Sequence, residues 1–148
     1  MIYTELTKKA MRIAYDAHKD QVDKTGLPYI FHPYHIAEYM TDEISVCAAL
    51  LHDVVEDTPL TFKDLASRGI PGEVIDIIRL LTHDTPVSYT EYIQNIKNSG
   101  NKVAIAVKLA DLYHNSNVSR LIGMDEKTIP RLDKYESAIV LLEDTKRG

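Results

Sequence analysis

The chain has 148 residues, 45% of them hydrophobic and 26% charged, which is the composition of an ordinary globular protein with one core. Its formal net charge of −5 and the absence of any run of lysines or arginines argue against general affinity for nucleic acid or an anionic membrane. The single cysteine, Cys47, excludes an intrachain disulfide and is expected to be a small buried hydrophobe in a reducing compartment. No apolar run reaches membrane-spanning length and no signal-peptide pattern is found, so a cytoplasmic location is expected.

The first part of the chain predicts a helix, a long loop and a second helix. Apolar residues recur at helical spacing over residues 4–22, with Thr4 or Thr7 as the cap. The periodicity fails over residues 22–33, where turn-forming residues and two prolines oppose a helix. A loop of this length in a compact domain is often functional. Pro33 suits the first turn of the short helix that follows.

The rest of the chain predicts further helices and no strand. Thr61 and Ser88 are expected caps, and Gly69 is an expected helix end. The expected helices cover residues 44–57, 61–69, 72–82, 88–99, 102–121 and 126–144. The prediction is an all-α helical bundle that forms a single domain over residues 1–148.

Residues 48–58 combine a buried helix with a cluster of ionisable side chains. His52, Asp53, Glu56 and Asp57 follow an apolar run, and burial of such groups is costly unless a counter-charge neutralises them. On a continuous helix, His52 and Glu56 share one face and Asp53 and Asp57 share the adjacent one. The pattern indicates two metal ligands, His52 and Asp53, and two acids one turn later that can handle water. The alternative is a polar helix face that meets solvent.

Other segments offer partners for such a metal site. His32 precedes Pro33, and Asp111 follows an apolar run in which an unpaired carboxylate would be expensive. His114, His18 and His83 are further candidates, although a lone histidine is more often a surface or hydrogen-bonded core residue. A set of His32, His52, Asp53 and Asp111 contains no thiolate, which disfavours a structural zinc site. Mixed imidazole and carboxylate ligands suit manganese or iron(II), and magnesium or catalytic zinc less well.

Several ordered motifs carry a resemblance to a known family. They are the stretches 17–18, 24–33, 48–58 and 108–115, read as AH, KTGLPYIFHP, AALLHDVVEDT and KLADLYHN. The chain resembles the HD-domain metal-dependent phosphohydrolases. More narrowly, it resembles the hydrolase domain of RelA/SpoT-type enzymes, which cleave the alarmone (p)ppGpp, and the small stand-alone bacterial members of that group.

The resemblance implies a role for each matching residue. His32, His52, Asp53 and Asp111 are expected to bind one divalent ion, typically Mn²⁺. Glu56 and Asp57 match the catalytic acidic pair, and Lys24 and Asn115 match substrate-binding residues. The implied reaction is hydrolysis of (p)ppGpp at the 3′ position, with release of pyrophosphate. Two alternatives stay open: hydrolysis of another nucleotide or a phosphomonoester, and a metal-containing nucleotide sensor without turnover.

Three positions depart from the alarmone-hydrolase pattern. Asp23 stands where those enzymes carry an arginine, so Asp23→Arg is expected to raise (p)ppGpp hydrolysis. Val118 replaces a threonine hydroxyl, and Leu112-Tyr113 replaces an Arg-Leu pair. Lys108 or Arg120 is the candidate replacement for the lost cation, and Tyr113 is a candidate for stacking on a base.

Overall fold

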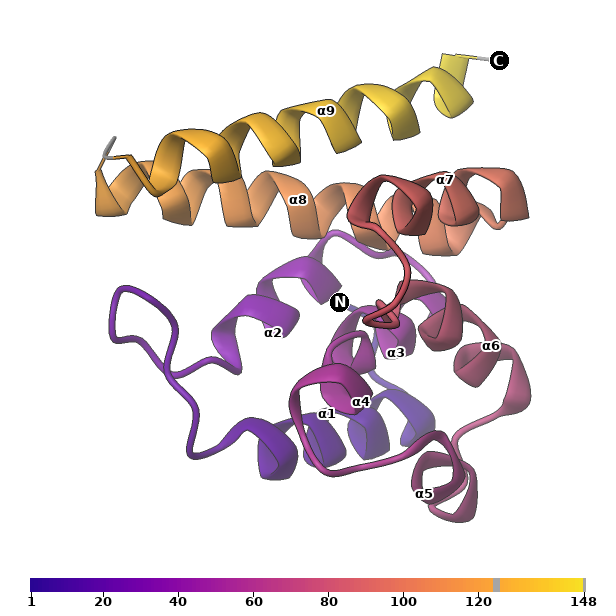
Figure 1. Ribbon diagram of the computed structural model, residues 1–148. Coiled ribbons are helices and arrows are strands. Elements are labelled where there is room, and N and C mark those ends of the chain that lie inside the picture. Colours follow the sequence, from indigo (N-terminus) through magenta and orange to yellow (C-terminus); the bar gives the residue numbers. More distant parts are fainter. Residues whose placement is uncertain (124–125, 148) are drawn as a thin grey trace.

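The computed structural model describes residues 1–123 and 126–147, and within these ranges the chain is helical (Figure 1). The helices are α1 (Glu5–His18), α2 (Phe31–Glu38), α3 (Glu43–Leu51), α4 (Val54–Asp57), α5 (Phe62–Ser67), α6 (Gly72–Leu81), α7 (Tyr89–Ser99), α8 (Lys102–Ile122) and α9 (Thr128–Arg147). In the described ranges the only β-type pairing is an isolated bridge between Val22 and Pro28. The predicted all-α class is therefore confirmed.

Helix α3 lies at the centre of the fold. Every residue from Ser45 to Leu51 is buried, and Cys47 is fully inaccessible, as predicted. Helix α3 packs against α1, α2, α6 and α8, so it is covered on all sides. A helix that is apolar all round is expected in such a position. Its C-terminal end consequently carries His52 into the interior.

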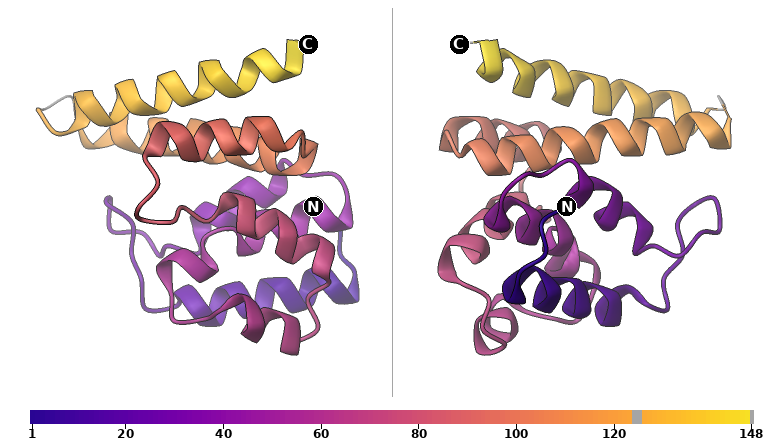
Figure 2. Two further views of the ribbon diagram at one scale, coloured as in Figure 1. Left: turned by 45° about the vertical axis from the view of Figure 1, so that its right-hand side comes forward. Right: turned by 180° about the vertical axis from the view of Figure 1, so that it is seen from behind.

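Helices α8 and α9 form an antiparallel hairpin that lies across the other helices in every view (Figures 1 and 2). Helix α8 contacts α2, α3, α6 and α7, whereas α9 packs on α8 and α7. Asp111 is near the middle of α8 and is buried. The hairpin therefore brings a carboxylate over the end of α3. In the described part of the chain, no helix combines the length and apolar character needed to cross a bilayer.

Local capping explains where most helices begin. The side chains of Thr4, Thr61 and Ser88 each accept a hydrogen bond from a backbone amide in the first turn of the helix that follows. Gly100 ends α7 in the left-handed region, with φ of 64°, which favours glycine. These starts and this end agree with the sequence predictions.

The predicted helix over residues 44–57 is wrong, because the chain turns at His52 and Asp53 between α3 and α4. Nδ1 of His52 lies 2.6 Å from the carbonyl oxygen of Ala49, the oxygen that a continuous helix gives to the amide of Asp53. The imidazole competes for this acceptor, and Asp53 becomes the N-cap of α4. Helix α1 also ends earlier than predicted, at His18.

Candidate metal centre and active site

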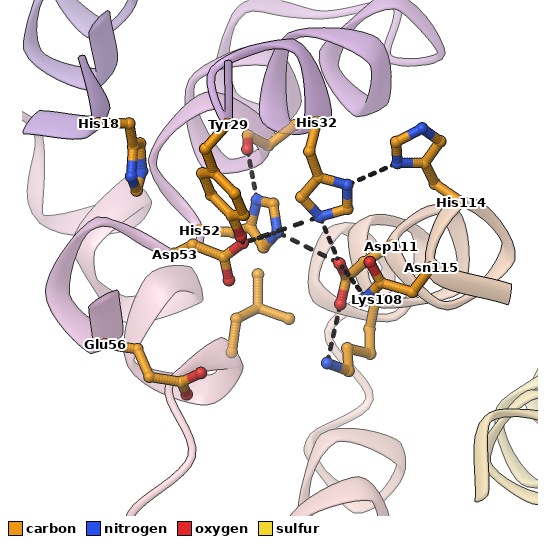
Figure 3. A network of polar contacts seen from close by, with 12 residues as sticks. His18, Tyr29, His32, His52, Asp53, Glu56, Lys108, Asp111, His114 and Asn115 are labelled. Atoms are coloured by element: carbon orange, nitrogen blue, oxygen red, sulfur yellow. Dashed lines mark hydrogen bonds and ion pairs between the residues drawn. The ribbon is translucent and has the colours of Figure 1, made fainter. Parts of the chain in front are cut away.

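Side chains from three parts of the fold converge below the α8–α9 hairpin. His32 comes from α2, His52 and Asp53 from the turn before α4, and Asp111 from α8. One possible ligand atom from each of these residues lies within 4.8 Å of all the others, and Figure 3 shows the four side chains pointing toward one another. The structure thus brings together the four residues that the sequence analysis grouped as metal ligands.

The distances describe a tight cluster. Nε2 of His32 lies 2.8 Å from Oδ1 of Asp111. Nε2 of His52 lies 3.0 Å from Oδ2 of Asp53 and 3.5 Å from Oδ1 of Asp111. Three of the residues are buried and Asp53 is partly so. All four therefore direct nitrogen or oxygen atoms at one small volume.

The single hydrogen bond described for His52 leaves its other ring nitrogen available to a metal ion. Its Nδ1–H donates to the carbonyl of Ala49, which leaves the lone pair of Nε2 facing the cluster. Nε2 is buried and makes no hydrogen bond of acceptable geometry within the described residues. An orphaned imidazole nitrogen next to two carboxylates matches the imidazole and oxygen donors that divalent cations take. The donor set therefore fits a divalent metal ion.

The carboxylates of the cluster lie next to imidazoles and to Lys108. Burial alone would raise the pKa of Asp53, but the adjacent His52 lowers it to about 2. Burial would likewise raise the pKa of Asp111, yet the neighbouring Lys108 holds it well below the ordinary value, with Nζ 2.9 Å from Oδ2. Despite burial, these carboxylates raise the pKa of His52. The cluster thus demands positive charge, and a metal ion would displace the imidazole proton.

The acidic pair lies beside this cluster, but not on the helix face that the sequence predicted. Because α3 and α4 are separate helices, Glu56 is not one turn above His52 on a common face. Oε1 of Glu56 accepts a hydrogen bond from the backbone amide of His83 at 2.6 Å. One carboxylate oxygen each from Asp53, Glu56 and Asp57 still lie within 4.8 Å of one another. Burial, and then the charges of Asp53 and Glu56, raise the pKa of Asp57 to about 6.

Tyr29 and His114 contact two of the proposed ligands; the sequence analysis offered His114 as a candidate ligand and did not single out Tyr29. The hydroxyl of Tyr29 donates to Oδ2 of Asp53, and burial together with that carboxylate raises the pKa of the phenol. Nδ1 of His114 lies 2.6 Å from Nδ1 of His32. Burial, and then the neighbouring imidazoles, lower the pKa of His114 to about 4. Sequence spacing gives no signal for either contact, because both join separate elements.

Two adjoining cavities open onto the cluster. One, of about 310 Å³, contains Lys24 and Asn115 in its lining, and the other, of about 270 Å³, contains Glu56, Asp57 and Lys108. Both are lined by Tyr29, Asn115 and Tyr135, so they meet along these side chains. Nδ2 of Asn115 also donates to Oδ1 of Asp111 at 3.1 Å. The two residues predicted to bind substrate thus lie on the path to the metal ligands.

Helix α9 adds a cation to this path that the sequence did not reveal. It is Lys134, which lines the second cavity and whose ammonium lies 4.2 Å from the centre of the Tyr89 ring. Burial, and then the charges of Arg131 and Lys134, lower the pKa of Lys24. Burial, and then the charges of Lys108 and Arg131, lower the pKa of Lys134. The depressed pKa values mark a cluster of positive charge that suits an anionic ligand.

Two residues that the sequence analysis offered for substrate binding, Arg120 as a cation and Tyr113 as a stacking partner for a base, lie away from the two cavities. Arg120 is exposed and pairs with Glu136 at 3.4 Å, whereas Lys108 does reach the site. Tyr113 lines a separate cavity, of about 420 Å³, and its hydroxyl donates to Glu143. The suggestion that Tyr113 stacks on a bound base is therefore not supported by its position.

Asp23 has a structural function in the loop between α1 and α2. Its Oδ1 accepts hydrogen bonds from the amide of Thr25 at 2.8 Å, the hydroxyl of Thr25 at 2.7 Å and the amide of Leu27 at 3.0 Å. The chain reverses here through Gly26, with φ of 89°. Arginine cannot accept these bonds, so the expected gain from Asp23→Arg is not supported.

A comparison with known families decides the identity of this fold. The profile of the HD domain matches residues 10–99. The chain belongs to the HD domain family. The match runs from the middle of α1 to the end of α7 and includes His32, His52 and Asp53, whereas Asp111 of α8 lies beyond it.

Curated relatives of this HD domain are larger proteins. A protein of Escherichia coli called bifunctional (p)ppGpp synthase/hydrolase SpoT is 45% identical over 62 residues, which are 39% of this chain and 9% of that protein. Proteins called guanosine-3′,5′-bis(diphosphate) 3′-pyrophosphohydrolase are 36% identical in Spiroplasma citri, over 73% of this chain and 16% of the relative. In Haemophilus influenzae the identity is 34%, over 78% of this chain and 19% of the relative. The chain thus spans less than a fifth of these relatives.

A solved structure matches this HD domain along its whole length. It is described as a metazoan ortholog of SpoT that hydrolyzes ppGpp and plays a role in starvation responses. The two chains superimpose with a TM-score of 0.76 at 26% identity, over 100% of this chain and 89% of the other. The α8–α9 hairpin is therefore included in the shared fold.

Removal of a cluster residue is expected to abolish metal binding. His52→Ala and Asp53→Ala each delete one of the converging donors, so both variants should lose bound Mn²⁺. Elemental analysis after Mn²⁺ loading and desalting measures this, and Mn²⁺ should raise the melting temperature of the wild type but of neither cluster variant. His35→Ala, outside the cluster, is the control. Full metal content in both cluster variants would refute the assignment.

The raised pKa of Asp57 predicts a stability change that depends on pH. The pKa of Asp57 is higher in the folded than in the unfolded state, because burial disfavours its charged form. The folded protein therefore loses stability as the pH rises from the ordinary aspartate pKa toward about 6. Asp57→Asn should therefore raise the melting temperature of the metal-free protein at about pH 8, and this gain should shrink by about pH 5. Asp76→Asn, on the exposed face of α6, is the control. An equal effect at both pH values would contradict the prediction.

Proposed function

We propose that this HD domain is a metal-dependent phosphohydrolase, a guanosine-3′,5′-bis(diphosphate) 3′-pyrophosphohydrolase that converts (p)ppGpp to GDP or GTP and pyrophosphate. The observation that carries the proposal is the convergence of His32, His52, Asp53 and Asp111 beside the acids Glu56 and Asp57. The names of the relatives and the extent of the structural match support the substrate.

The four converging residues would hold one divalent ion, for which Mn²⁺ is the proposed identity because imidazole and carboxylate donors are mixed without a thiolate. When bound, such an ion acidifies water to a nucleophile near neutral pH and polarises a phosphoryl oxygen. His52 is prepared for this role by its bond to the Ala49 carbonyl. Lys108 and Asn115 hold the carboxylate of Asp111 from outside the cluster.

Glu56 and Asp57 are the proposed proton-handling residues. They line the cavity that also exposes Asp53 and Asp111, so they face the reacting volume without belonging to the four-residue set. The backbone amide of His83 fixes the Glu56 carboxylate, which suits it to orient the attacking water. Burial raises the pKa of Asp57 to about 6, so that this carboxyl holds its proton closer to neutral pH than an ordinary aspartate, which suits a general acid.

The cations around the path are the proposed phosphate-binding groups. Lys24 lies at one cavity, Lys108 and Lys134 lie at the other, and Asn115 lies where the two meet. A guanosine with phosphates at both the 3′ and 5′ positions needs positive charge on two sides, and this arrangement supplies it. The negative charge of Asp23 opposes the same substrate. Its Oδ1 also accepts hydrogen bonds from the loop amides of Thr25 and Leu27.

Two alternatives are separated from this proposal by one assay. Another nucleotide or a phosphomonoester would require the same metal cluster but would be turned over faster than ppGpp in a panel of substrates. A nucleotide sensor would bind without turnover. The assay is Mn²⁺-dependent release of pyrophosphate or phosphate from ppGpp, pppGpp, GTP, ATP and a phosphomonoester.

Amide substitutions of the acidic pair test the enzymatic role directly. Glu56→Gln and Asp57→Asn preserve shape but not proton transfer, so single-turnover ppGpp hydrolysis should fall about 100-fold or more. Mn²⁺ content and nucleotide affinity measured by calorimetry should be retained, and Glu73→Gln is the control on an exposed helix. If both variants kept wild-type turnover, neither acid would belong to the mechanism.

Neutralisation of Asp23 tests whether its charge limits use of the substrate. Asp23→Asn keeps an acceptor oxygen for the loop amides and removes the negative charge beside Lys24. The specificity constant for ppGpp should rise by up to about tenfold, the order of one partly screened charge interaction. Asp23→Arg should do worse than Asp23→Asn because it breaks the loop bonds, and the exposed Asp20→Asn should change nothing. A fall with Asp23→Asn would show that the charge itself is needed.

A further inference from the structure

His32 presents its two ring nitrogens to different partners. Nε2 faces the metal cluster, 2.8 Å from Oδ1 of Asp111. Nδ1 points the opposite way, 2.6 Å from Nδ1 of His114 on α8, as Figure 3 shows. The two ring planes differ by only 20° and the ring centres are 4.8 Å apart, as expected for imidazoles joined edge to edge. His114 therefore lies directly behind a proposed metal ligand.

The short nitrogen–nitrogen distance shows that the two rings share a proton. Two imidazole nitrogens 2.6 Å apart must share one proton, because two lone pairs or two N–H groups would repel each other. If Nε2 of His32 binds a metal ion, it carries no proton, and the neutral ring must carry its proton on Nδ1. His32 then donates and His114 accepts. An accepting nitrogen on His114 thus stabilises the one tautomer of His32 that can be a ligand.

We propose that His114 is a positioning residue for the metal centre, acting through His32 rather than on the substrate. This inference rests on the proposed metal site and adds a residue outside the four converging donors. Hydrogen bonds to the outer nitrogen of a ligating histidine orient the ring and raise its basicity. His32 is itself buried, with 7% of its surface exposed, and no other polar group among the described residues contacts its Nδ1.

The alternative is that His114 only fills space between α2 and α8. Its ring also packs on His35, with centres 4.5 Å apart, so a packing role is physically reasonable. The two roles make opposite demands on a substitution. Packing needs an aromatic ring, whereas positioning needs an acceptor atom at the place of Nδ1.

Two variants therefore separate the roles. His114→Phe keeps the ring and removes the acceptor. His114→Asn removes the ring, but its side-chain oxygen occupies the position of Nδ1. His35→Phe is the matched control, because it changes the imidazole that packs on the other side of His114 and leaves the His32–His114 contact intact.

The measurement is the affinity of the full chain for Mn²⁺, determined by competition with a fluorescent chelator, with circular dichroism as a check on folding. His114→Phe should weaken Mn²⁺ binding by about 10- to 100-fold, the range typical for loss of such a partner. His114→Asn should stay within about threefold of wild type, and His35→Phe should match wild type.

Each contrary result has a distinct meaning. Wild-type affinity in His114→Phe, or an equal loss in His114→Asn, would overturn the positioning role and leave the metal site standing. Failure of the wild type to bind Mn²⁺ would overturn the metal site and this inference together. Because substrate is absent from the measurement, neither result depends on which nucleotide is hydrolysed.

Discussion

The accumulation of negative charge at the end of a buried helix is the constraint on which this structure depends. Helix α3 is enclosed on all sides and delivers His52 and Asp53 into the interior, where α8 adds Asp111. Such carboxylates are costly unless they are paired, and here the imidazoles of His32 and His52 and the ammonium of Lys108 lie next to them. Tyr29, His114 and Asn115 form hydrogen bonds with Asp53, His32 and Asp111, respectively. The site is thus built into the core rather than placed on its surface.

Local chemistry explains why much of the fold was predictable from the sequence. Caps such as Thr61 and Ser88, and a left-handed glycine at position 100, act within one turn of the chain. The break between α3 and α4 was not predictable, because it depends on the His52 side chain competing for a backbone acceptor. The ligand residues were visible in the motifs, whereas their convergence depends on how α8 crosses α2 and α3.

The substrate-facing half of the site was harder to predict than the metal-facing half. Lys134 and Tyr135 reach the cavities only because α9 folds back along α8, and their sequence neighbourhood resembles any amphipathic helix. The loop role of Asp23 was hidden for a related reason. The three hydrogen bonds to its Oδ1 depend on how the chain turns between α1 and α2, so the sequence shows the charge of this residue but not the bonds that it makes.

Acids and cations lie together in the site, and this couples the proposed binding of metal and nucleotide. One cavity contains Asp53, Glu56, Asp57 and Asp111 together with Lys108 and Lys134, and Lys24 lines the adjoining cavity. A polyphosphate that approaches the four carboxylates without a metal ion is repelled by them, even though the lysines attract it. A divalent cation beside the carboxylates reverses that repulsion, so metal affinity and nucleotide affinity must be coupled, and by linkage each must raise the other. The same buried acids that make the fold depend on a counter-charge therefore make substrate binding depend on it as well.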